Sequence, residues 1–256
     1  MNTTNSRKVI LITGSATGIG RELAINAVQQ GNSVVVNSRK QERLAPIIDV
    51  LEQLGAQYLA VESDLRSEEG AKTLIDSSLE KFGTIDVLVN NAAGLFFSPA
   101  EQISLNGWRA VLDTCLTTAF LCSKAIYPYF EQQHNGAIWN ISSVAAYRPH
   151  PGAAHYAAAK AGMNSLTETL AVEWGPAGIQ VNGIAFGAVW TEHSRFDNPA
   201  HRQSVEFELP GKRVATASEA AAIALRLINI SYPYFTGETI RVDGGFRGIL
   251  KNPSND

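Results

Sequence analysis

The sequence predicts an α/β fold in which a doubly wound parallel sheet carries helices on both faces. Short apolar, β-branched segments alternate with segments of helical spacing along the whole chain. The apolar segments are continuous rather than alternating, which is typical of parallel strands buried on both faces. The 256 residues contain no evident linker, internal repeat or low-complexity tract. We therefore expect a single domain over residues 1–256.

Composition argues against several classes of protein. Charged residues are 18% of the chain and the formal net charge is −3, which gives no electrostatic case for nucleic-acid or anionic-membrane partners. The opening MNTTNSRKVI lacks an apolar signal core and no apolar run reaches ~18 residues, so a cytoplasmic location is expected. Cys115 and Cys122 lie seven positions apart in a predicted helix, which suits neither a metal site nor a disulfide. We expect two buried cysteines and no metal.

The first unit of the chain has the pattern strand, glycine turn, helix, strand. Lys8–Thr13 is a buried strand, Arg21–Gln30 has helical spacing, and Ser33–Asn37 is a second strand. Between the first strand and the helix lies TGSATGIG, whose glycines allow a tight turn and a close backbone approach. The N-terminus of the helix can then face a pyrophosphate, which favours a nucleotide site over a plain strand-to-helix turn. The glycines are Gly14, Gly18 and Gly20.

The end of the second strand, Asn37-Ser38-Arg39-Lys40, predicts which dinucleotide binds. An acidic residue here would accept a hydrogen bond from the 2′-hydroxyl of NAD, whereas a cation would suit the 2′-phosphate of NADP. The stretch has no carboxylate and two adjacent cations. NADP is therefore favoured over NAD, with Arg39 as the clamp, because a guanidinium can bind phosphate through two hydrogen bonds. The alternative is a solvated pair of charges that opens the next helix.

The alternation of strands and helices continues to the end of the chain. Further helices are expected at Gln41–Gly55, Glu68–Phe82, about Asn106–Phe130, around Tyr156 to Trp174, and Ser218–Leu227. Further strands are expected at Gln57–Ser63, Ile85–Val89, Ala137–Ile141, Gln180–Ile184 and Thr239–Val242. Ligands of such sheets bind beyond the carboxyl ends of the strands. The residues that follow strand ends, and so predict one common site, are Gly14, Arg39, Asp64, Asn90, Ser143 and Gly187.

Ser143, Tyr156 and Lys160 form the candidate catalytic group. Ser143 follows the strand Ala137–Ile141, whereas Tyr156 and Lys160 are four positions apart and share one face of a helix. A phenol beside an ammonium can act as a general acid/base, because the cation stabilises the phenolate and lowers the pKa from ~10. The serine hydroxyl can hold a carbonyl or carbinol oxygen. Alternatively, Tyr156 and Lys160 belong to an ordinary amphipathic helix, because this spacing alone is common.

The least regular segment, about residues 190–213, is polar, weakly periodic and rich in loop signals. It directly follows the carboxyl end of a strand, where long segments often close over a site. We expect a substrate loop or lid here, with a surface loop or an oligomer contact as the alternative. His150 and His155 flank the loop before Tyr156 and could touch a substrate, although an exposed loop histidine is the commoner outcome.

Together these motifs resemble the short-chain dehydrogenase/reductase superfamily, in its NAD(P)-dependent branch of similar chain length. The resemblance covers the whole chain, from TGSATGIG through Asn90–Gly94 to Ile240–Gly245. It implies a Rossmann-like fold in which Asp64 contacts adenine, Lys160 also bonds the nicotinamide ribose and Ser143 binds the substrate oxygen. With the ribose-end residues above, the expected cofactor-binding residues are Gly14, Ser15, Thr17, Gly18, Ile19, Gly20, Ser38, Arg39, Asp64, Leu65, Asn91, Ala92, Tyr156, Lys160, Gly187, Val189 and Thr191. The expected substrate residues are Ser143, Tyr156, Phe186 and Trp190.

Three positions depart from the family pattern. Ala93 replaces a usual glycine, with Gly94 one place later, and Phe186 precedes Gly187 where the family usually has proline and glycine. Phe186 adds an aromatic surface near the cofactor. Cys115 stands where the family often has an asparagine that holds a water in a proton relay to the lysine. A thiol is a poor hydrogen-bond partner, so the relay is expected to use another group or to run slowly.

The expected function is NADP(H)-dependent reduction of a ketone or aldehyde, or oxidation of a secondary alcohol, by hydride transfer. One alternative is an enoyl- or dienoyl-thioester reductase, because Asn90–Gly94 and Leu170–Pro176 are similar to 2,4-dienoyl-CoA reductases. Those enzymes lack the usual catalytic tyrosine, which this chain keeps at Tyr156. Cations that could serve a thioester's CoA, or simply belong to a solvated lid, are Arg195, Arg202, Lys212 and Arg213. The other alternative is a nucleotide-binding regulatory protein, supported by Cys115 and Phe186.

The expected partners are a small carbonyl or alcohol substrate and further copies of the chain. The resemblance implies a homodimer or homotetramer built from the helices around residues 106–130 and 155–174 and from the C-terminal segment. Gly248–Lys251 carries two apolar side chains past the last strand, which is consistent with a subunit contact.

Overall fold

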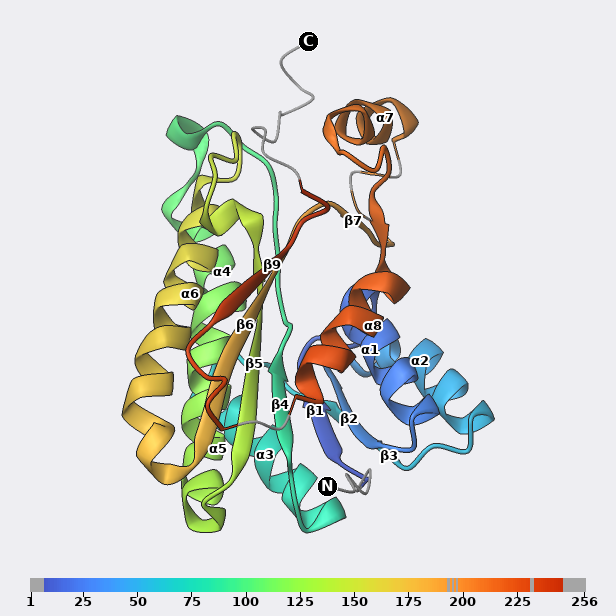
Figure 1. The fold of residues 1–256 in the computed structure, drawn as a ribbon, viewed down its shortest axis with the longest axis vertical. Coiled ribbons are helices and arrows are strands. Elements are labelled where there is room, and N and C mark those ends of the chain that lie inside the picture. The colour runs from blue at the N-terminus through green and yellow to red at the C-terminus, as the bar shows by residue number, and fades with distance from the viewer. Residues whose placement is uncertain (1–6, 193, 195, 197, 231–232, 246–256) are drawn as a thin grey trace.

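The computed structural model describes residues 7–192, 194, 196, 198–230 and 233–245. Its centre is a parallel sheet of seven strands in the order β3-β2-β1-β4-β5-β6-β9 (Figure 1). The strands are β1 Val9–Ile12, β2 Ser33–Ser38, β3 Tyr58–Glu62, β4 Val87–Asn90, β5 Gly136–Ser143, β6 Ile179–Phe186 and β9 Thr239–Val242. The strand order reverses between β1 and β4, which makes the carboxyl end of this pair the switch point where open α/β sheets bind ligands. The expected α/β class is confirmed.

Helices cover both faces of the sheet (Figure 1). Residues of α1, α2 and α8 pack in one core cluster, and residues of α3, α5 and α6 pack in the other. The helices are α1 Gly18–Gln29, α2 Gln41–Gln53, α3 Glu68–Phe82, α4 Leu105–Leu112, α5 Thr118–Gln133, α6 Ala154–Trp174, α7 Pro199–Glu208 and α8 Ala217–Ile228. Short turns of 3-10 helix lie at η1 Ala100–Gln102, η3 Val144–Ala146 and η4 Gly175–Ala177.

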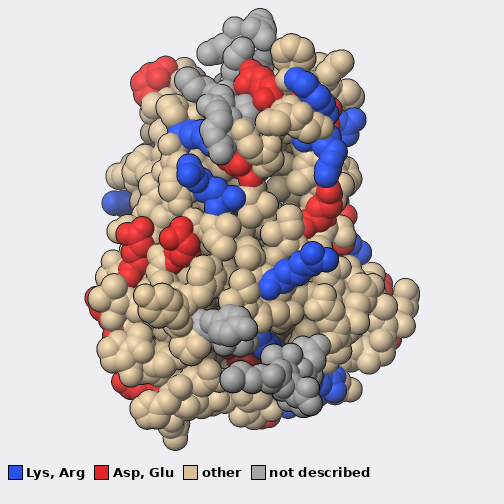
Figure 2. All heavy atoms as spheres, viewed as in Figure 1, with Lys and Arg blue, Asp and Glu red and all other residues tan. Residues whose placement is uncertain are grey.

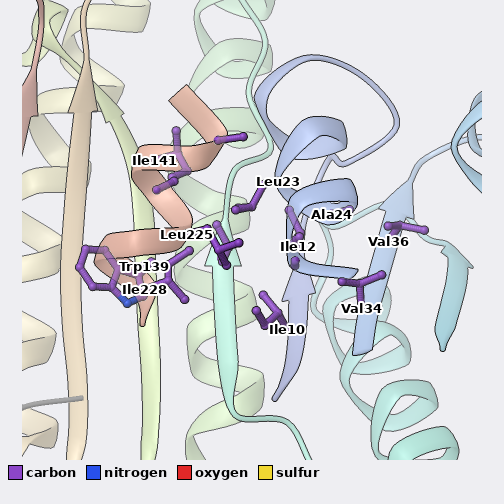
Figure 3. Packing of buried hydrophobic residues seen from close by; sticks show 14 of the residues in the cluster. Ile10, Ile12, Leu23, Ala24, Val34, Val36, Trp139, Ile141, Leu225 and Ile228 are labelled. Atoms are coloured by element: carbon purple, nitrogen blue, oxygen red, sulfur yellow. The ribbon is translucent and has the colours of Figure 1, made fainter. Parts of the chain in front are cut away.

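The alternation of side chains along β1 explains why its sequence is apolar throughout. Ile10 and Ile12 face the cluster beneath α1 and α8, whereas Val9 and Leu11 face the opposite cluster. Successive residues of a strand point to opposite faces, and here both faces are covered. Figure 3 shows the first cluster, in which Leu225 and Ile228 of α8 lie near Trp139 of β5.

Two segments have structure that the sequence analysis did not assign. The stretch expected as one helix over 106–130 is α4 and α5 joined by a π-helical turn, η2, at Asp113–Thr117. The segment 190–213 contains the helix α7, and Val189–Trp190 (β7) pairs with Ala215–Thr216 (β8). α7 begins because the Asn198 side chain accepts hydrogen bonds from the amides of Ala200 and His201, while Pro199 fills the first helical position.

The continuous helical stretch Leu105–Gln133 is long and apolar enough, by length and composition alone, to cross a membrane. In this fold it serves as a core helix. Cys122, Ile126 and Phe130 have no exposed surface and pack in the cluster with α3 and α6. On the face seen in Figure 2, Lys and Arg side chains are interspersed with Asp and Glu.

We predict that Leu225→Ala lowers the free energy of unfolding by about 2–5 kcal/mol, because Leu225 has no exposed surface and its truncation leaves a cavity under α8. Chemical denaturation measures this change. Ile223→Ala on the same helix is the matched control, because Ile223 is 37% exposed. An equal loss in both variants would contradict the packing described for α8.

Candidate active site

Two adjoining cavities lie at the carboxyl edge of the sheet. The larger, about 590 Å³, is lined by Ser143, Tyr156 and Lys160, and the smaller, about 510 Å³, by Arg39 and Asp64. Both are also lined by Gly14, Thr17 and Ala93, so they meet at the glycine turn. An elongated molecule can therefore lie across the switch point with one end in each cavity.

The glycine turn brings the backbone of two strands into close approach. Gly14 has φ +60°, and a Cβ atom there would lie 2.8 Å from the Cα of Ala92. At Gly20, a Cβ would lie 2.4 Å from the Nδ2 of Asn91, which donates to the carbonyl oxygens of Thr13 and Gly14. These glycines therefore let the loop after β4 pack directly on the loop after β1.

The start of α1 faces the cavities. Gly18 and Ile19 line the larger one, and the Thr17 side chain makes no hydrogen bond that caps the helix. Ser15 lies behind the turn, where its Oγ donates to the carbonyl of Ile12 and accepts from the amide of Asn37. The first turn of α1 is thus positioned to receive an anionic group, with Ser15 and Gly20 shaping the turn rather than lining either cavity.

The smaller cavity is rich in cations. Arg39 and Arg43 both line it and are exposed, and neither side chain has a hydrogen bond or ion pair within the part of the chain that the structure describes. Asp64 is held by Arg66, whose Nε lies 2.9 Å and 3.1 Å from the two carboxylate oxygens. This hydrogen bond lowers the pKa of Asp64. Ser38 and Leu65 also line the cavity, whereas the sequence analysis did not anticipate Arg43.

The catalytic candidates converge as the sequence predicts. The strand register sets Ser143, the last residue of β5, opposite Phe186, the last residue of β6. The Ser143 hydroxyl lies close enough to Tyr156 to lower the pKa of the phenol. On α6, the Nζ of Lys160 lies 5.7 Å from the centroid of the Tyr156 ring. One hydroxyl, one phenol and one ammonium therefore meet where the strands end.

Burial dominates the electrostatics of Tyr156 and Lys160. Lys160 is only 1% exposed, and its Nζ donates to the carbonyl of Ile141 at 2.6 Å. Burial lowers the pKa of Lys160. Burial raises the pKa of Tyr156, the nearby Cys115 adds to that increase, and the neighbouring Ser143 hydroxyl opposes it. The ammonium of Lys160 alone was expected to lower the pKa of Tyr156. The pKa is raised instead, because desolvation of the phenolate outweighs the other effects.

Cys115 lies in the π-helical turn and is fully buried. Its Sγ accepts a hydrogen bond from the amide of Gly94 at 3.4 Å and donates to the carbonyl of the same residue at 3.3 Å. The thiol thus joins the helix to the loop after β4. It also packs with Tyr156 and Ala159 in a small apolar cluster. A π turn often marks a functional position in a helix, and here it sets a side chain against the loop beside the larger cavity.

The end of β6 and the segment after it line the larger cavity with Phe186, Gly187, Ala188, Val189 and Thr191. Trp190, which was expected to touch substrate, lines neither cavity and is 38% exposed. Val189 and Trp190 form the short strand β7, in which successive side chains point to opposite faces, so Val189 faces the cavity and Trp190 points away from it.

Aromatic and imidazole groups complete the larger cavity. His150 lines it, with its ring centroid 6.5 Å from that of Tyr156. His155 does not line the cavity. Its side chain is buried beside Phe96, with the ring centroids 4.4 Å apart, and its Nδ1 accepts a hydrogen bond from the amide of Tyr156. Lining residues that the sequence analysis missed include Leu95, Phe97, Val144, Phe196, His201 and Val205.

Comparisons with known proteins agree with this geometry. A model of the family described as short chain dehydrogenase matches residues 8–202. The chain is 35% identical over 244 residues to a probable 2,4-dienoyl-CoA reductase [(2E)-enoyl-CoA-producing] of Bacillus subtilis, covering 93% of this chain and 96% of that protein. It is 37% identical over 242 residues to 3beta-hydroxysteroid dehydrogenase 1 of Eggerthella lenta, covering 93% of each. A gluconate 5-dehydrogenase from Burkholderia cenocepacia, in complex with NADP and tartrate, is 30% identical, with a TM-score of 0.87 and coverage of 93% of this chain and 94% of that one.

We predict that Cys115→Ala increases the hydrogen-exchange rate of the Gly94 amide, because the substitution removes both thiol contacts to that residue. Cys115→Ser keeps a donor and an acceptor at the position and is expected to restore part of the protection. Exchange at single amides, followed by NMR, measures the effect.

Cys122→Ala is the matched control. Cys122 is also fully buried, but it lies on α5 in a different core cluster from Cys115. This variant is expected to lose stability without a selective change at Gly94. Unchanged exchange at Gly94 in Cys115→Ala would show that the thiol does not hold the loop.

Proposed function

The chain belongs to the short-chain dehydrogenase family, and we propose that it is an NADP(H)-dependent oxidoreductase that interconverts a ketone or aldehyde with the corresponding alcohol. The arrangement of Ser143, Tyr156 and Lys160 beside the glycine turn is the observation that carries this proposal. A protein that only binds a nucleotide has no need of a hydroxyl, a phenol and an ammonium that line the same cavity as the glycine turn. Cys115 and Phe186 supported the alternative of a regulatory protein. In the structure, Cys115 bonds the loop after β4 through Gly94, and Phe186 pairs with Ser143 at the end of the sheet.

In this proposal each side chain has a separate task. The bound nicotinamide cofactor supplies or accepts the hydride. Tyr156 gives its proton to the carbonyl oxygen during reduction and takes the proton of the alcohol during oxidation. Ser143 holds the same oxygen through its hydroxyl. Lys160 is anchored by the Ile141 carbonyl, and it keeps a positive charge near the phenol when Tyr156 loses its proton.

The residues around the smaller cavity fit a dinucleotide that carries a 2′-phosphate. Arg39 and Arg43 are cations without an ion pair among the described residues, and Ser38 adds a hydroxyl to the same cavity. No carboxylate ends β2, and of the two carboxylates that line the smaller cavity, Asp64 is engaged by Arg66 and Glu192 follows β7. The Burkholderia relative contains NADP. NADP is therefore the proposed cofactor, with Arg39 and Arg43 sharing its phosphate.

An enoyl- or dienoyl-thioester reductase is the second candidate. The Bacillus subtilis relative at 35% identity favours it. Tyr156 favours the carbonyl reductase, because reduction of a ketone needs a proton donor at the oxygen. A panel of ketones and 2,4-dienoyl thioesters, assayed with NADPH, distinguishes the two candidates.

The proposal extends to the rest of the chain. We propose one domain with residues 190–213 as a lid, because Thr191, Ser194, Phe196, His201 and Val205 of that segment line the larger cavity. A cytoplasmic homodimer or homotetramer with contacts along α4, α5 and α6 is part of the same proposal. Arg195 and the C-terminal residues Gly248–Lys251 lie outside the described residues.

We predict that Tyr156→Phe lowers kcat for ketone reduction by about 10²–10⁴, because the variant lacks the proton donor. Affinity for NADPH, measured by fluorescence titration, is expected to change little. Tyr147→Phe is the matched control, because Tyr147 is 44% exposed and lines neither cavity. Full activity in Tyr156→Phe would refute the role given to the phenol.

The pH dependence of the wild-type enzyme provides a second check on the same role. Reduction requires the neutral phenol, and burial raises the pKa of Tyr156, so the reductive rate should stay level as pH rises from neutral into the alkaline range. Oxidation requires the phenolate, so the oxidative rate should increase over the same range. Parallel pH profiles of kcat/KM in the two directions would contradict this assignment.

We predict that Arg39→Ala and Arg43→Ala each raise the Kd for NADPH about tenfold, because each removes a charge-assisted hydrogen bond to phosphate. The Kd for NADH should remain within about twofold, since NADH lacks the 2′-phosphate. Lys40→Ala is the control, because Lys40 lies between the two arginines in sequence but does not line the cavity. Equal affinity of the wild type for NADH and NADPH would overturn the proposed cofactor preference.

A further inference from the structure

The substrate end of the larger cavity is walled by apolar side chains from four parts of the fold. The loop after β4, the turn η3, the end of β6 and the segment 190–213 all contribute. The residues are Leu95, Phe97, Val144, Phe186, Phe196 and Val205. Because these residues and Tyr156 line the same cavity, a substrate held at the phenol can place its apolar part against them.

One pair of rings lies beside the phenol. Phe97 and His150 have ring centroids 5.7 Å apart, and His150 is perpendicular to Tyr156 at 6.5 Å. The loops that carry these rings are tied together, because the amide of Ser98 donates to the carbonyl of Gly152 at 2.9 Å. This part of the wall is therefore formed before a substrate enters.

A second pair of rings comes from the segment before and within α7. Phe196 and His201 are stacked, with centroids 5.5 Å apart and an interplanar angle of 6°. Phe196 also packs against the small cluster of Val205, Leu209 and Val214. The flat faces of an aromatic ring favour stacked or edge-on contact with another ring, so both pairs suit a cyclic ligand.

Charge is scarce in this cavity. Of the described residues that line it, Lys160 alone carries a formal charge, and its ammonium is directed at the Ile141 carbonyl. In the segment 190–213, Arg213 pairs with Glu219 and the Nζ of Lys212 donates to the Phe207 carbonyl, while Arg202 follows the lining residue His201 in α7. A carboxylate or phosphate placed against these walls would lose hydration and would meet no cationic side chain other than Lys160 among the described lining residues.

We infer that the substrate is an uncharged ketone or secondary alcohol whose reacting carbon is attached to an alicyclic or aromatic ring or is part of an alicyclic one. This inference rests on the proposed function, because it takes Tyr156 as the group that meets the reacting oxygen. The ring occupies the space between the Phe97–His150 pair and the Phe196–His201 pair. Phe97 and Phe196 are then specificity residues that contact the substrate and take no part in proton transfer.

Four methyl ketones test the inference, with NADPH oxidation as the readout. Acetophenone and cyclohexyl methyl ketone carry a ring, 2-octanone has the same number of carbons without one, and 4-acetylbenzoate adds a carboxylate to the ring. The kcat/KM of the two ring ketones should exceed that of 2-octanone and that of 4-acetylbenzoate by about tenfold or more, given the worth of ring contacts and the penalty for a buried charge.

Variants then locate the preference in the two ring pairs. Phe97→Leu and Phe196→Leu should each lower kcat/KM for acetophenone about three- to tenfold, mainly through KM, and change that for 2-octanone less than about twofold. Phe207→Leu is the matched control, because Phe207 is 76% exposed on α7 and lines neither cavity. Equal losses for both ketones would show that the phenyl groups support the fold and do not recognise a ring.

The outcomes separate the two levels of the proposal. Efficient reduction of 2-octanone or 4-acetylbenzoate at the expense of the ring ketones would overturn the substrate class and leave the oxidoreductase assignment in place. No hydride transfer to any of the four ketones would overturn the proposed carbonyl reduction, and the ring inference with it.

Discussion

The hydrogen bond from Lys160 to the carbonyl of Ile141 is the interaction on which the geometry of the site depends. It spans 2.6 Å between α6 and β5, and both groups are buried. An ammonium without a partner in this position would cost several kcal/mol, so the bond is strongly preferred over alternatives in which α6 shifts along the sheet. Ser143 follows Ile141 by two residues and Tyr156 precedes Lys160 by one helical turn. One interaction therefore fixes the serine and the phenol relative to each other.

A chain of polar contacts below that bond carries the same alignment through the core. Asn140 of β5 donates to the Oγ1 of Thr167 on α6 and accepts from the Nδ2 of Asn90 on β4. Ser142 donates to the Oδ1 of Asn164 at 2.6 Å. These contacts are directional, whereas the apolar packing around them tolerates small displacements. The core is thus polar where β4, β5 and α6 must keep their register, and apolar beneath α1 and α8, where no such constraint applies.

Much of the fold could be predicted because its signals are local and repeated. Continuous apolar strands, helical spacing and the glycine turn lie in single stretches of sequence, and the strand ends gathered the catalytic candidates as expected. The π turn at Cys115 could not be anticipated, because it leaves no mark in the residue spacing. The helix α7 was missed although Asn198 and Pro199 form a recognisable start, since its few apolar positions face only a small cluster. Arg43 was missed because its role depends on where the first turn of α2 points.

The two adjoining cavities differ in charge, and this difference separates the binding of the cofactor from the selection of the substrate. In the smaller cavity, Arg39 and Arg43 have no ion pair among the described residues and can gain new hydrogen bonds from an anionic ligand. In the larger cavity, the walls at the substrate end are apolar, and the ammonium of Lys160 already donates to the carbonyl of Ile141. A large cofactor can therefore supply most of the binding energy through its phosphates, while the substrate is selected by the shape and polarity of its apolar part. Changes among the wall residues can then alter the substrate without disturbing Ser143, Tyr156 or Lys160, because those three are held by β5 and α6 and not by the walls.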